Sequence, residues 1–273
     1  MTLITVTERL LILIPAYNEE KNISQVICGV QQVVPQADIV VVDDGSKDDT
    51  AQVAEAAGAL TIKHPFNLCI GGAVQTGLKF AQQRGYDLVI RIDGDGQHDP
   101  NHIPLILSAL CRQEADVVIC SRFLNKVENS YIPLSRLIGI RFFAMLVSWL
   151  TGQTATDTTS GFMGMNRQAV DTLVTYMPQD YPEVESRLIL HKCQLSTLEI
   201  PVCMQARIHG QSSINSRRSL YYAVKVSIAL ALTIMKDFSS KSKEVPYAYS
   251  YRATNYGRLL QPHFGRSDDS THS

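Results

Sequence analysis

Three carboxylates follow an apolar run of strand length, and all three fall within seven consecutive positions. The segment from Arg91 to Pro100 reads RIDGDGQHDP. Asp93 and Asp95 lie two residues apart, so their negative charges repel each other unless a cation lies between them. Mg²⁺ or Mn²⁺ is commonly held by one or two carboxylates together with phosphate oxygens and water. An acidic turn in solvent is the alternative interpretation, but the position at a strand end favours a divalent metal at Asp93 and Asp95, oriented by Gln97 and Asp99.

A second acidic pair, Asp43 and Asp44, also follows an apolar run. Carboxylate oxygens accept hydrogen bonds, so this pair suits the base or the ribose hydroxyls of a nucleotide. A turn before a helix N-cap explains the same residues without a ligand. Tyr17, in the segment PAYNEE, either stacks on a base or ribose or belongs to a loop that caps the next helix. Gly71 and Gly72 open a helix, and such a start offers backbone N–H groups to an anion.

The elements that would position these side chains alternate along the first 120 residues. Apolar runs predict strands at 10–14, 39–42, 60–62, 88–92 and 117–120. Segments of helix length lie between most of them, at 21–34, 50–57, 72–84 and 103–112. Continuous apolar runs indicate strands buried on both faces, and their alternation with helices indicates βαβ units and a parallel sheet. Ligands bind outside the carboxyl ends of the strands in such sheets, which is where the polar motifs fall.

The second half of the chain has a different pattern, with longer helices and fewer strands. Residues 131–150 and 182–192 are expected to be helices, 155–164 a loop and 198–206 a strand.

The C-terminal region contains a long apolar segment at 219–238. Lys225 interrupts this segment, and the uncharged run that remains is too short to cross a bilayer. The segment suits either a buried core or dimer helix or a helix that lies on a membrane surface. We therefore expect a main domain over 1–215, an apolar helix over 216–240 and a polar tail, disordered by its composition, over 241–273.

Composition excludes several classes of protein. The chain has 273 residues, 45% of them hydrophobic, and a net charge of −1, so no basic field draws it to nucleic acid. Its six cysteines include no C-x-x-C pair, which argues against a zinc site. Because the N-terminus lacks the features of a secretory signal, the cysteines are expected to be reduced thiols of a cytoplasmic protein. No G-x-G-x-x-G follows the first strand, which disfavours an NAD-dependent Rossmann enzyme.

The motifs occur in one characteristic order. They are PAYNEE at 15–20, VVDDGSKDDT at 41–50, N-x-x-x-G-G-A at 67–73 and DGDGQHDP at 93–100. Together they resemble family 2 glycosyltransferases of the GT-A fold. Three more motifs are similar to the dolichyl-phosphate mannosyltransferase-like branch of that family: SRF at 121–123, DTTSGF at 157–162 and R-x-x-G-x-S at 207–212.

This resemblance implies a fold, an activity and a set of site residues. It implies a mostly parallel α/β sheet flanked by helices, with a helical C-terminal segment. It also implies inverting transfer of a sugar from a UDP- or GDP-linked donor, with Mg²⁺ or Mn²⁺ as cofactor. The expected donor-binding residues are Pro15, Tyr17, Glu19, Asp43, Asp44, Gly72 and Asp93. The expected metal-site residues are Asp93, Asp95 and Gln97.

Two kinds of acceptor are compatible with the sequence. A polyprenyl phosphate is already anionic, so it needs cations rather than a base. Its expected binding residues are Arg122, Arg136, Arg207 and Ser212. A hydroxyl group of a glycan or small molecule needs a general base instead, and Glu183 or Glu185 lies where other family members carry a catalytic acidic residue. The lipid phosphate is our first hypothesis.

The remaining expectations concern partners and location. A non-catalytic nucleotide-sugar-binding subunit is the rival from another class, but the intact acidic and arginine residues argue against it. The expected partners are the donor and the lipid phosphate, with a membrane surface and a second copy of the chain left open. A peripheral position on the cytoplasmic face of a membrane is compatible with the sequence, which fixes neither the sugar nor the base.

Overall fold

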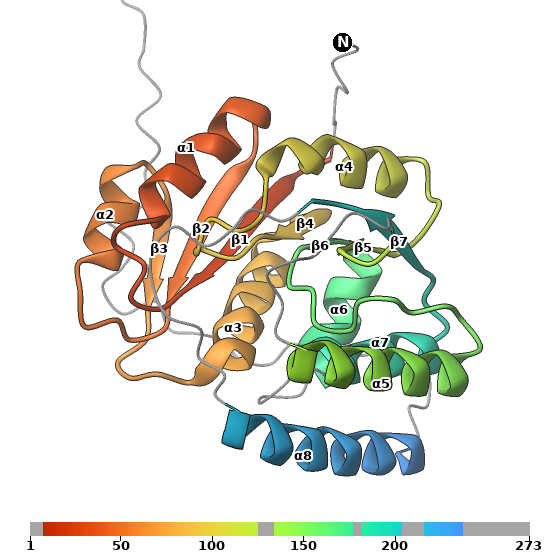
Figure 1. Cartoon of the computed structure of the whole chain (residues 1–273). Helices are drawn as coiled ribbons and strands as arrows, with labels where there is room; N and C mark the ends of the chain where they lie inside the picture. The colour runs from red at the N-terminus through yellow and green to blue at the C-terminus, as the bar shows by residue number, and fades with distance from the viewer. Residues whose placement is uncertain (1–7, 125–133, 177–181, 204–215, 237–273) are drawn as a thin grey trace, which may run out of the picture. The chain divides into compact units, whose positions relative to one another are not determined.

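A computed structural model describes residues 8–124, 134–176, 182–203 and 216–236 of the chain (Figure 1). Its centre is a seven-stranded sheet with the strand order β3-β2-β1-β4-β6-β5-β7. The strands are β1 (Leu10–Ala16), β2 (Asp38–Asp43), β3 (Leu60–Lys63), β4 (Leu88–Arg91), β5 (Val117–Ser121), β6 (Met163–Asn166) and β7 (Thr197–Pro201). Every strand expected from the apolar runs of the sequence is present.

The sheet is mostly parallel, which confirms the predicted fold class. β1 pairs in parallel with β2 and β4, β2 with β3, and β5 with β7. β6 runs antiparallel to both β4 and β5. The sequence did not predict β6, whose four residues, MGMN, overlap the expected loop at 155–164. A run this short, with a glycine and an asparagine, carries too little strand propensity to be recognised.

Helices cover both faces of the sheet (Figure 1). They are α1 (Ile23–Val33), α2 (Thr50–Ala56), α3 (Cys69–Arg84), α4 (Ile103–Cys111), α5 (Leu134–Thr151), α6 (Arg167–Tyr176), α7 (Pro182–Lys192) and α8 (Ser216–Met235), with a short 3₁₀ helix, η1 (Pro100–His102), before α4. Alternate residues of a strand point to opposite faces. Ile12 and Ile14 of β1 therefore join a core with α1 and α4, whereas Leu11 and Leu13 join a second core with α3 and α6.

β3 and β7 form the two edges of the sheet and are less buried than the strands between them. Leu60 of β3 is 38% exposed, whereas every residue of β1 is buried. The expectation of strands buried on both faces is therefore wrong for β3. An edge strand has a neighbour on one side only, so solvent reaches side chains that an inner strand would bury.

A third apolar cluster joins α5, α7 and α8. Phe143 and Val147 of α5 pack with Val184 and Leu188 of α7 and with Leu230 of α8. The apolar C-terminal segment therefore buries one face of a helix against the rest of the domain. Within the ranges that the structure describes, no helix is both long enough and apolar enough to span a bilayer.

Polar contacts fix the C-terminal end of α8 on α7. Nζ of Lys192 donates to the carbonyl oxygens of Thr233 (3.0 Å), Ile234 (2.7 Å) and Lys236 (2.6 Å). Glu185 accepts a hydrogen bond from the hydroxyl of Thr233. A cation is favourable here because the last carbonyl groups of a helix lack helical partners and carry partial negative charge.

Gly77 allows α3 to lie close against the sheet, and a methyl group at this position should destabilise the fold. A Cβ atom there would lie 2.1 Å from Cδ1 of Leu13, whose side chain is fully buried. We expect Gly77→Ala to lower the free energy of unfolding by about 1–3 kcal/mol, because overpacking forces side chains out of their rotamers. Gly139 of α5 has open space at its Cβ position, so Gly139→Ala should be neutral or stabilising. Urea unfolding of both variants tests this packing, and a Gly77→Ala protein as stable as wild type would contradict it.

Candidate functional site

The carboxyl ends of β1, β2 and β4 lie side by side and carry the acidic motifs. Ala16 at the end of β1 is in register with Asp43 at the end of β2, and Leu13 of β1 is in register with Arg91 of β4. The backbone N–H of Asp44 donates to the carbonyl oxygen of Ala16 at 2.9 Å. The strand order therefore brings three sequence motifs together at the carboxyl ends of neighbouring strands, as expected for ligand sites in parallel sheets.

Hydrogen bonds lock the loop after β1 onto the loop after β2. The backbone N–H of Asn18 donates to Oγ of Ser46 at 2.9 Å, and that of Glu19 donates to Oγ1 of Thr50 at 2.8 Å. Tyr17 is 42% exposed beside these contacts. The two loops thus form one surface from which the ring of Tyr17 projects.

The other donor-binding candidates of these segments lie deeper or serve packing. Pro15 is buried within β1. Oε2 of Glu19 accepts a hydrogen bond from the Asn22 side chain at 2.7 Å. Gly72 lies in the first turn of α3, where a Cβ atom would come within 2.6 Å of Cβ of Leu68. Its small size therefore lets the loop before α3 fold back on the helix.

Asp43 and Asp44 are both buried, and their contacts differ. Oδ1 of Asp43 accepts from the backbone N–H of Ser46 at 3.0 Å. Oδ2 of Asp43 is buried without a hydrogen-bond donor among the described residues, and Nζ of Lys63 lies 3.9 Å away. Oδ1 of Asp44 accepts from the backbone N–H of Leu68 at 2.8 Å and lies 2.8 Å from Nδ1 of His64.

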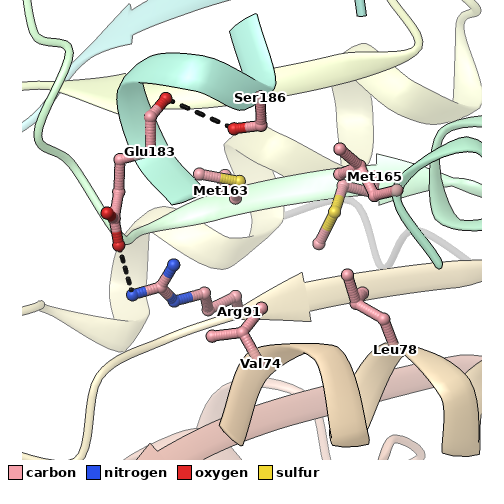
Figure 2. A pocket seen from close by; sticks show the side chains of 8 residues that line it. Val74, Leu78, Arg91, Met163, Met165, Glu183 and Ser186 are labelled. Carbon is pink, nitrogen blue, oxygen red and sulfur yellow. Dashed lines mark hydrogen bonds and ion pairs between the residues drawn. The ribbon is translucent and has the colours of Figure 1, made fainter. Parts of the chain in front are cut away.

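Arg91 pairs with Glu183 of α7 beside a small cavity that both residues line (Figure 2), and it also pairs with Asp93. Its Nη2 lies 3.2 Å from Oδ1 of Asp93 and 3.1 Å from Oε1 of Glu183. The Arg91 side chain is 3% exposed. Burial alone would lower the pKa of this guanidinium, but Asp93 and Glu183 outweigh burial and raise the pKa above its ordinary value. The structure thus brings Asp93 and Glu183 together through Arg91, to which the sequence analysis assigned no role.

His98 packs behind the metal-site candidates and is buried. Its Nδ1 accepts a hydrogen bond from the backbone N–H of Asp93 at 3.2 Å, and its ring stacks on Phe162 with 5.1 Å between centroids. Burial lowers the pKa of His98, and this outweighs the opposing effect of Asp93 and Asp95. A neutral ring agrees with an Nδ1 that accepts. Oδ1 of Asp95 accepts from the backbone N–H of Gln97 at 3.1 Å, so this turn is held by its own polar groups.

Two glycines allow neighbouring segments to close over Asp93. A Cβ atom at Gly161, in the DTTSGF motif, would lie 2.6 Å from Oδ2 of Asp93 and 2.8 Å from Nη2 of Arg91. A Cβ atom at Gly94 would lie 3.3 Å from Cβ of Ala16. The motif between α5 and β6 therefore packs directly on the carboxylate that follows β4.

Arg122 belongs to a buried network of alternating charges. Its Nε and Nη2 donate to the two carboxylate oxygens of Asp157 at 2.6 and 2.7 Å. Arg187 of α7 donates to the carbonyl oxygen of Asp157 at 2.7 Å and pairs with Glu199 at 2.7 Å. Burial would raise the pKa of Asp157, but Arg122 holds it below its ordinary value. Asp157 and Gly161 belong to the same DTTSGF motif, and Gly161 packs against Asp93, so the network lies near the acidic turn.

The other acceptor candidates differ in what the structure says of them. Glu185 is buried and bonds to Thr233 of α8, so it faces away from Arg91 and its partner Glu183. Arg207 and Ser212 lie outside the described residues, as does the side chain of Arg136.

The protein groups near the acidic turn suit a metal that a ligand helps to bind. The described ranges hold no cluster of three or more His, Cys, Asp or Glu side chains that could bind a metal ion unaided. A two-carboxylate site fits Mg²⁺ or Mn²⁺, which takes its remaining oxygens from water and substrate phosphates.

Sequence reasoning missed several buried partners of the predicted residues. Arg91 left a signal, because it is a lone charge inside the apolar strand LVIR. Asp157 lies in a quoted motif, but nothing in the sequence links it to Arg122. His64 and Arg187 carry no local signal, since their partners Asp44 and Asp157 lie 20 and 30 residues away. Glu199 carries none either, and one of its partners, the backbone N–H of Thr156, lies 43 residues away.

Known proteins have sequences similar to that of this chain. Residues 11–174 match the family described as Glycosyl transferase family 2. UDP-N-acetylglucosamine–dolichyl-phosphate N-acetylglucosaminyltransferase of Methanococcus voltae is 30% identical over 210 residues, covering 70% of this chain and 83% of that protein. Polyprenol monophosphomannose synthase of Mycolicibacterium smegmatis is 27% identical, covering 77% of this chain and 82% of that protein.

Solved structures agree on the fold. Glucosyl-3-phosphoglycerate synthase from Mycobacterium tuberculosis, in complex with Mn²⁺, uridine-diphosphate-glucose and phosphoglyceric acid, matches with a TM-score of 0.66. The match covers 85% of this chain and 82% of that chain at 19% identity, so it bears on the fold alone. The sequence match, the mostly parallel sheet and the named relatives together show that this chain is a glycosyltransferase of the GT-A fold and belongs to glycosyl transferase family 2.

Proposed function

We propose that the chain transfers a sugar, with inversion, from a UDP- or GDP-linked donor to a polyprenyl phosphate, using Mg²⁺ or Mn²⁺. The observation that carries this proposal is the convergence of Asp43, Asp44 and Asp93 at the adjoining ends of β1, β2 and β4. The lipid acceptor is supported by the relatives, whose names specify dolichyl phosphate and polyprenol.

The buried acidic pair favours a base that carries N–H donors. An ionised carboxylate only accepts hydrogen bonds. Uracil at N3 and guanine at N1 present a ring N–H on the pairing edge, whereas adenine and cytosine present amino N–H groups there. Oδ2 of Asp43 is buried and short of a donor among the described residues, so a base N–H or a ribose hydroxyl would relieve an unfavourable state. This chemistry is compatible with the UDP- or GDP-linked donor proposed here.

Asp93 and Asp95, with Gln97, would hold the metal ion beside the donor diphosphate. When bound, the ion acts as a Lewis acid that neutralises the leaving diphosphate. Arg91 contributes by fixing Oδ1 of Asp93, and His98 by accepting from the Asp93 backbone. The carboxylates are therefore held in place before the ligand arrives, which reduces the cost of ordering them.

The contacts of the two glutamates favour an acceptor that needs no base. Glu183 is committed to an ion pair with Arg91, and Glu185 bonds to Thr233 of α8. A general base must instead direct a lone pair at the acceptor hydroxyl. A phosphate oxygen arrives deprotonated, so it can attack the anomeric carbon without proton removal. Asp157 fixes the plane of the Arg122 guanidinium, which suits it to bind such an anion.

The exposed faces of α5 and α8 support a membrane surface as the place where the acceptor is met. Eight of the fifteen large hydrophobic side chains exposed among the described residues lie on these two helices: Ile138, Phe142, Met145, Trp149, Ile228, Leu232, Ile234 and Met235. The four positions on α5 are three or four residues apart, as are Ile228, Leu232 and Met235 on α8, so each helix carries an apolar stripe. The charged residues of both helices are all basic, namely Arg136, Arg141, Arg217, Arg218 and Lys225. Apolar stripes with basic neighbours suit the interface of an anionic bilayer.

Asp95→Asn should abolish metal-dependent transfer without unfolding the protein, since it removes one charge of the proposed metal pair. We also expect it to remove the rise in melting temperature that UDP or GDP with Mn²⁺ gives the wild type by mass action. Asp87→Asn is the matched control, because Asp87 bonds to the Arg9 backbone just before β4 begins, at the opposite end of that strand. Full transfer by the wild type in EDTA would contradict metal dependence.

Transfer to a short-chain polyprenyl phosphate should depend on Arg122 more than on Glu183. Glu183→Gln keeps a hydrogen-bond acceptor for Arg91 and should retain most activity. Arg122→Lys keeps the charge but loses the two-point contact by which Asp157 orients the cation, so KM for the acceptor should rise about ten-fold or more. The alternative of a hydroxyl acceptor predicts the reverse order, with Glu183→Gln lowering the rate by about 10²–10⁴. Transfer to a glycan but to no polyprenyl phosphate would support that alternative.

Trp149 provides a direct test of membrane binding. It is the only tryptophan of the chain and is 78% exposed on α5. Its fluorescence should shift to shorter wavelength when vesicles containing an anionic lipid are added, because the ring enters the bilayer interface. Met145→Glu should weaken vesicle binding about ten-fold or more, whereas Leu105→Glu, at an exposed position of α4, should not. An unchanged spectrum with anionic vesicles would contradict the membrane proposal.

A further inference from the structure

Both ring nitrogens of His64, a residue next to the acidic pair of Asp43 and Asp44, form hydrogen bonds. His64 lies outside every motif identified in the sequence. It follows β3 directly and is 7% exposed. Its Nδ1 lies 2.8 Å from Oδ1 of Asp44, and its Nε2 lies 2.9 Å from Oγ1 of Thr76 on α3. The ring therefore bridges the loop after β2 and the helix that packs on the sheet.

The partners of His64 define the direction of its hydrogen bonds. The carboxylate of Asp44 can only accept, so Nδ1 carries the hydrogen and donates it. In the neutral ring, Nε2 then accepts from the hydroxyl of Thr76. Thr76 thus holds the ring from its far side, with Nδ1–H directed at Asp44.

The two oxygens of Asp44 are used differently. Oδ1 accepts from both Nδ1 of His64 and the backbone N–H of Leu68. No residue in the described ranges donates to Oδ2. The carboxylate is thus held by one oxygen, and the other is left to accept from a ligand.

Rotation of the Asp44 carboxylate is opposed from two directions. Turning Oδ1 away would leave buried donors of His64 and Leu68 without an acceptor, which is unfavourable. The loop that carries both donors also lies against Gly45, where a Cβ atom would be 2.7 Å from the carbonyl carbon of Phe66. Asp44 therefore keeps one orientation without any ligand.

We propose that His64 is a positioning residue for nucleotide recognition: by holding Oδ1 of Asp44, it presents Oδ2 to a base N–H or ribose hydroxyl of the donor. This inference rests on the proposed function, because it requires that Asp44 contacts the nucleotide. His64 itself touches Asp44 and Thr76 and acts through Asp44.

Two isosteric substitutions separate the two hydrogen bonds of His64. The amide nitrogen of asparagine occupies the place of Nδ1, so His64→Asn keeps the donor to Asp44. The amide of glutamine occupies the place of Nε2, so His64→Gln keeps the contact with Thr76 and loses the donor to Asp44. Both variants are uncharged and polar, and each is the control for the other.

Calorimetric titration with UDP and with GDP, in the presence of Mn²⁺, provides the measurement. We expect His64→Asn to bind the preferred nucleotide within about three-fold of wild type and His64→Gln to bind it about ten-fold or more weakly, since a hydrogen bond to a charged group is lost. Melting temperatures of the two unliganded variants should be similar. A positioning role predicts that the two variants differ in their affinity for the nucleotide and not in their stability.

Other results would overturn the inference in distinguishable ways. If both variants bind the nucleotide as tightly as wild type, or if both lose affinity equally in step with their melting temperatures, His64 has no positioning role while the proposed function stands. If wild type binds neither UDP nor GDP, the proposed function fails and the inference fails with it.

Discussion

One buried guanidinium, that of Arg91, allows two carboxylates from distant parts of the chain to meet at the end of the central sheet. Asp93 follows β4 and Glu183 begins α7, and both lie within 3.2 Å of the Nη2 atom between them. Without this cation the two acidic groups would repel each other in a poorly hydrated place. Losing one member of this group of three leaves its partners uncompensated, and the same loss in a fully buried ion pair typically costs about 3–5 kcal/mol. The position of α7 over the sheet and the position of the acidic turn therefore both depend on the ion pairs of Arg91.

α7 links the acidic turn at the sheet to the helix α8 through three of its charged side chains. Glu183 reaches Arg91, Arg187 reaches Asp157 and Glu199, and Lys192 reaches the last carbonyl groups of α8. One helix of eleven residues thus contacts Arg91 beside the metal-site candidates, the Arg122 network and the C-terminal end of α8. In the proposed reaction a lipid acceptor and a water-soluble donor meet within one site, and α7 connects the segments that would bind each of them.

The sequence was informative where residues act through local pattern. Apolar runs located β1, β2, β4 and β5, because inner strands of a parallel sheet are buried on both faces and show it in their composition. The same runs placed the acidic motifs at strand ends. The order of the motifs gave the resemblance to family 2 glycosyltransferases, which implies the GT-A fold. β6 was not predicted, because four residues that include a glycine have almost no preference for the strand conformation. Its pairing is decided by the strands beside it.

The sequence was least informative about which charges pair, and that limit has a physical origin. Arg122 and Arg187 look alike in the sequence, as cations near apolar residues. Arg122 donates to the Asp157 carboxylate through two nitrogens, whereas Arg187 donates to the Asp157 carbonyl oxygen and pairs with Glu199. Such pairings depend on which strands are adjacent, and adjacency is a property of the whole sheet. Asp157 precedes β6 and Glu199 lies in β7, and these strands flank β5, from which Arg122 follows. Once the unpredicted strand β6 enters the sheet beside β5, the charges of this network can come together, so missing one weak strand conceals the partners of a whole buried network.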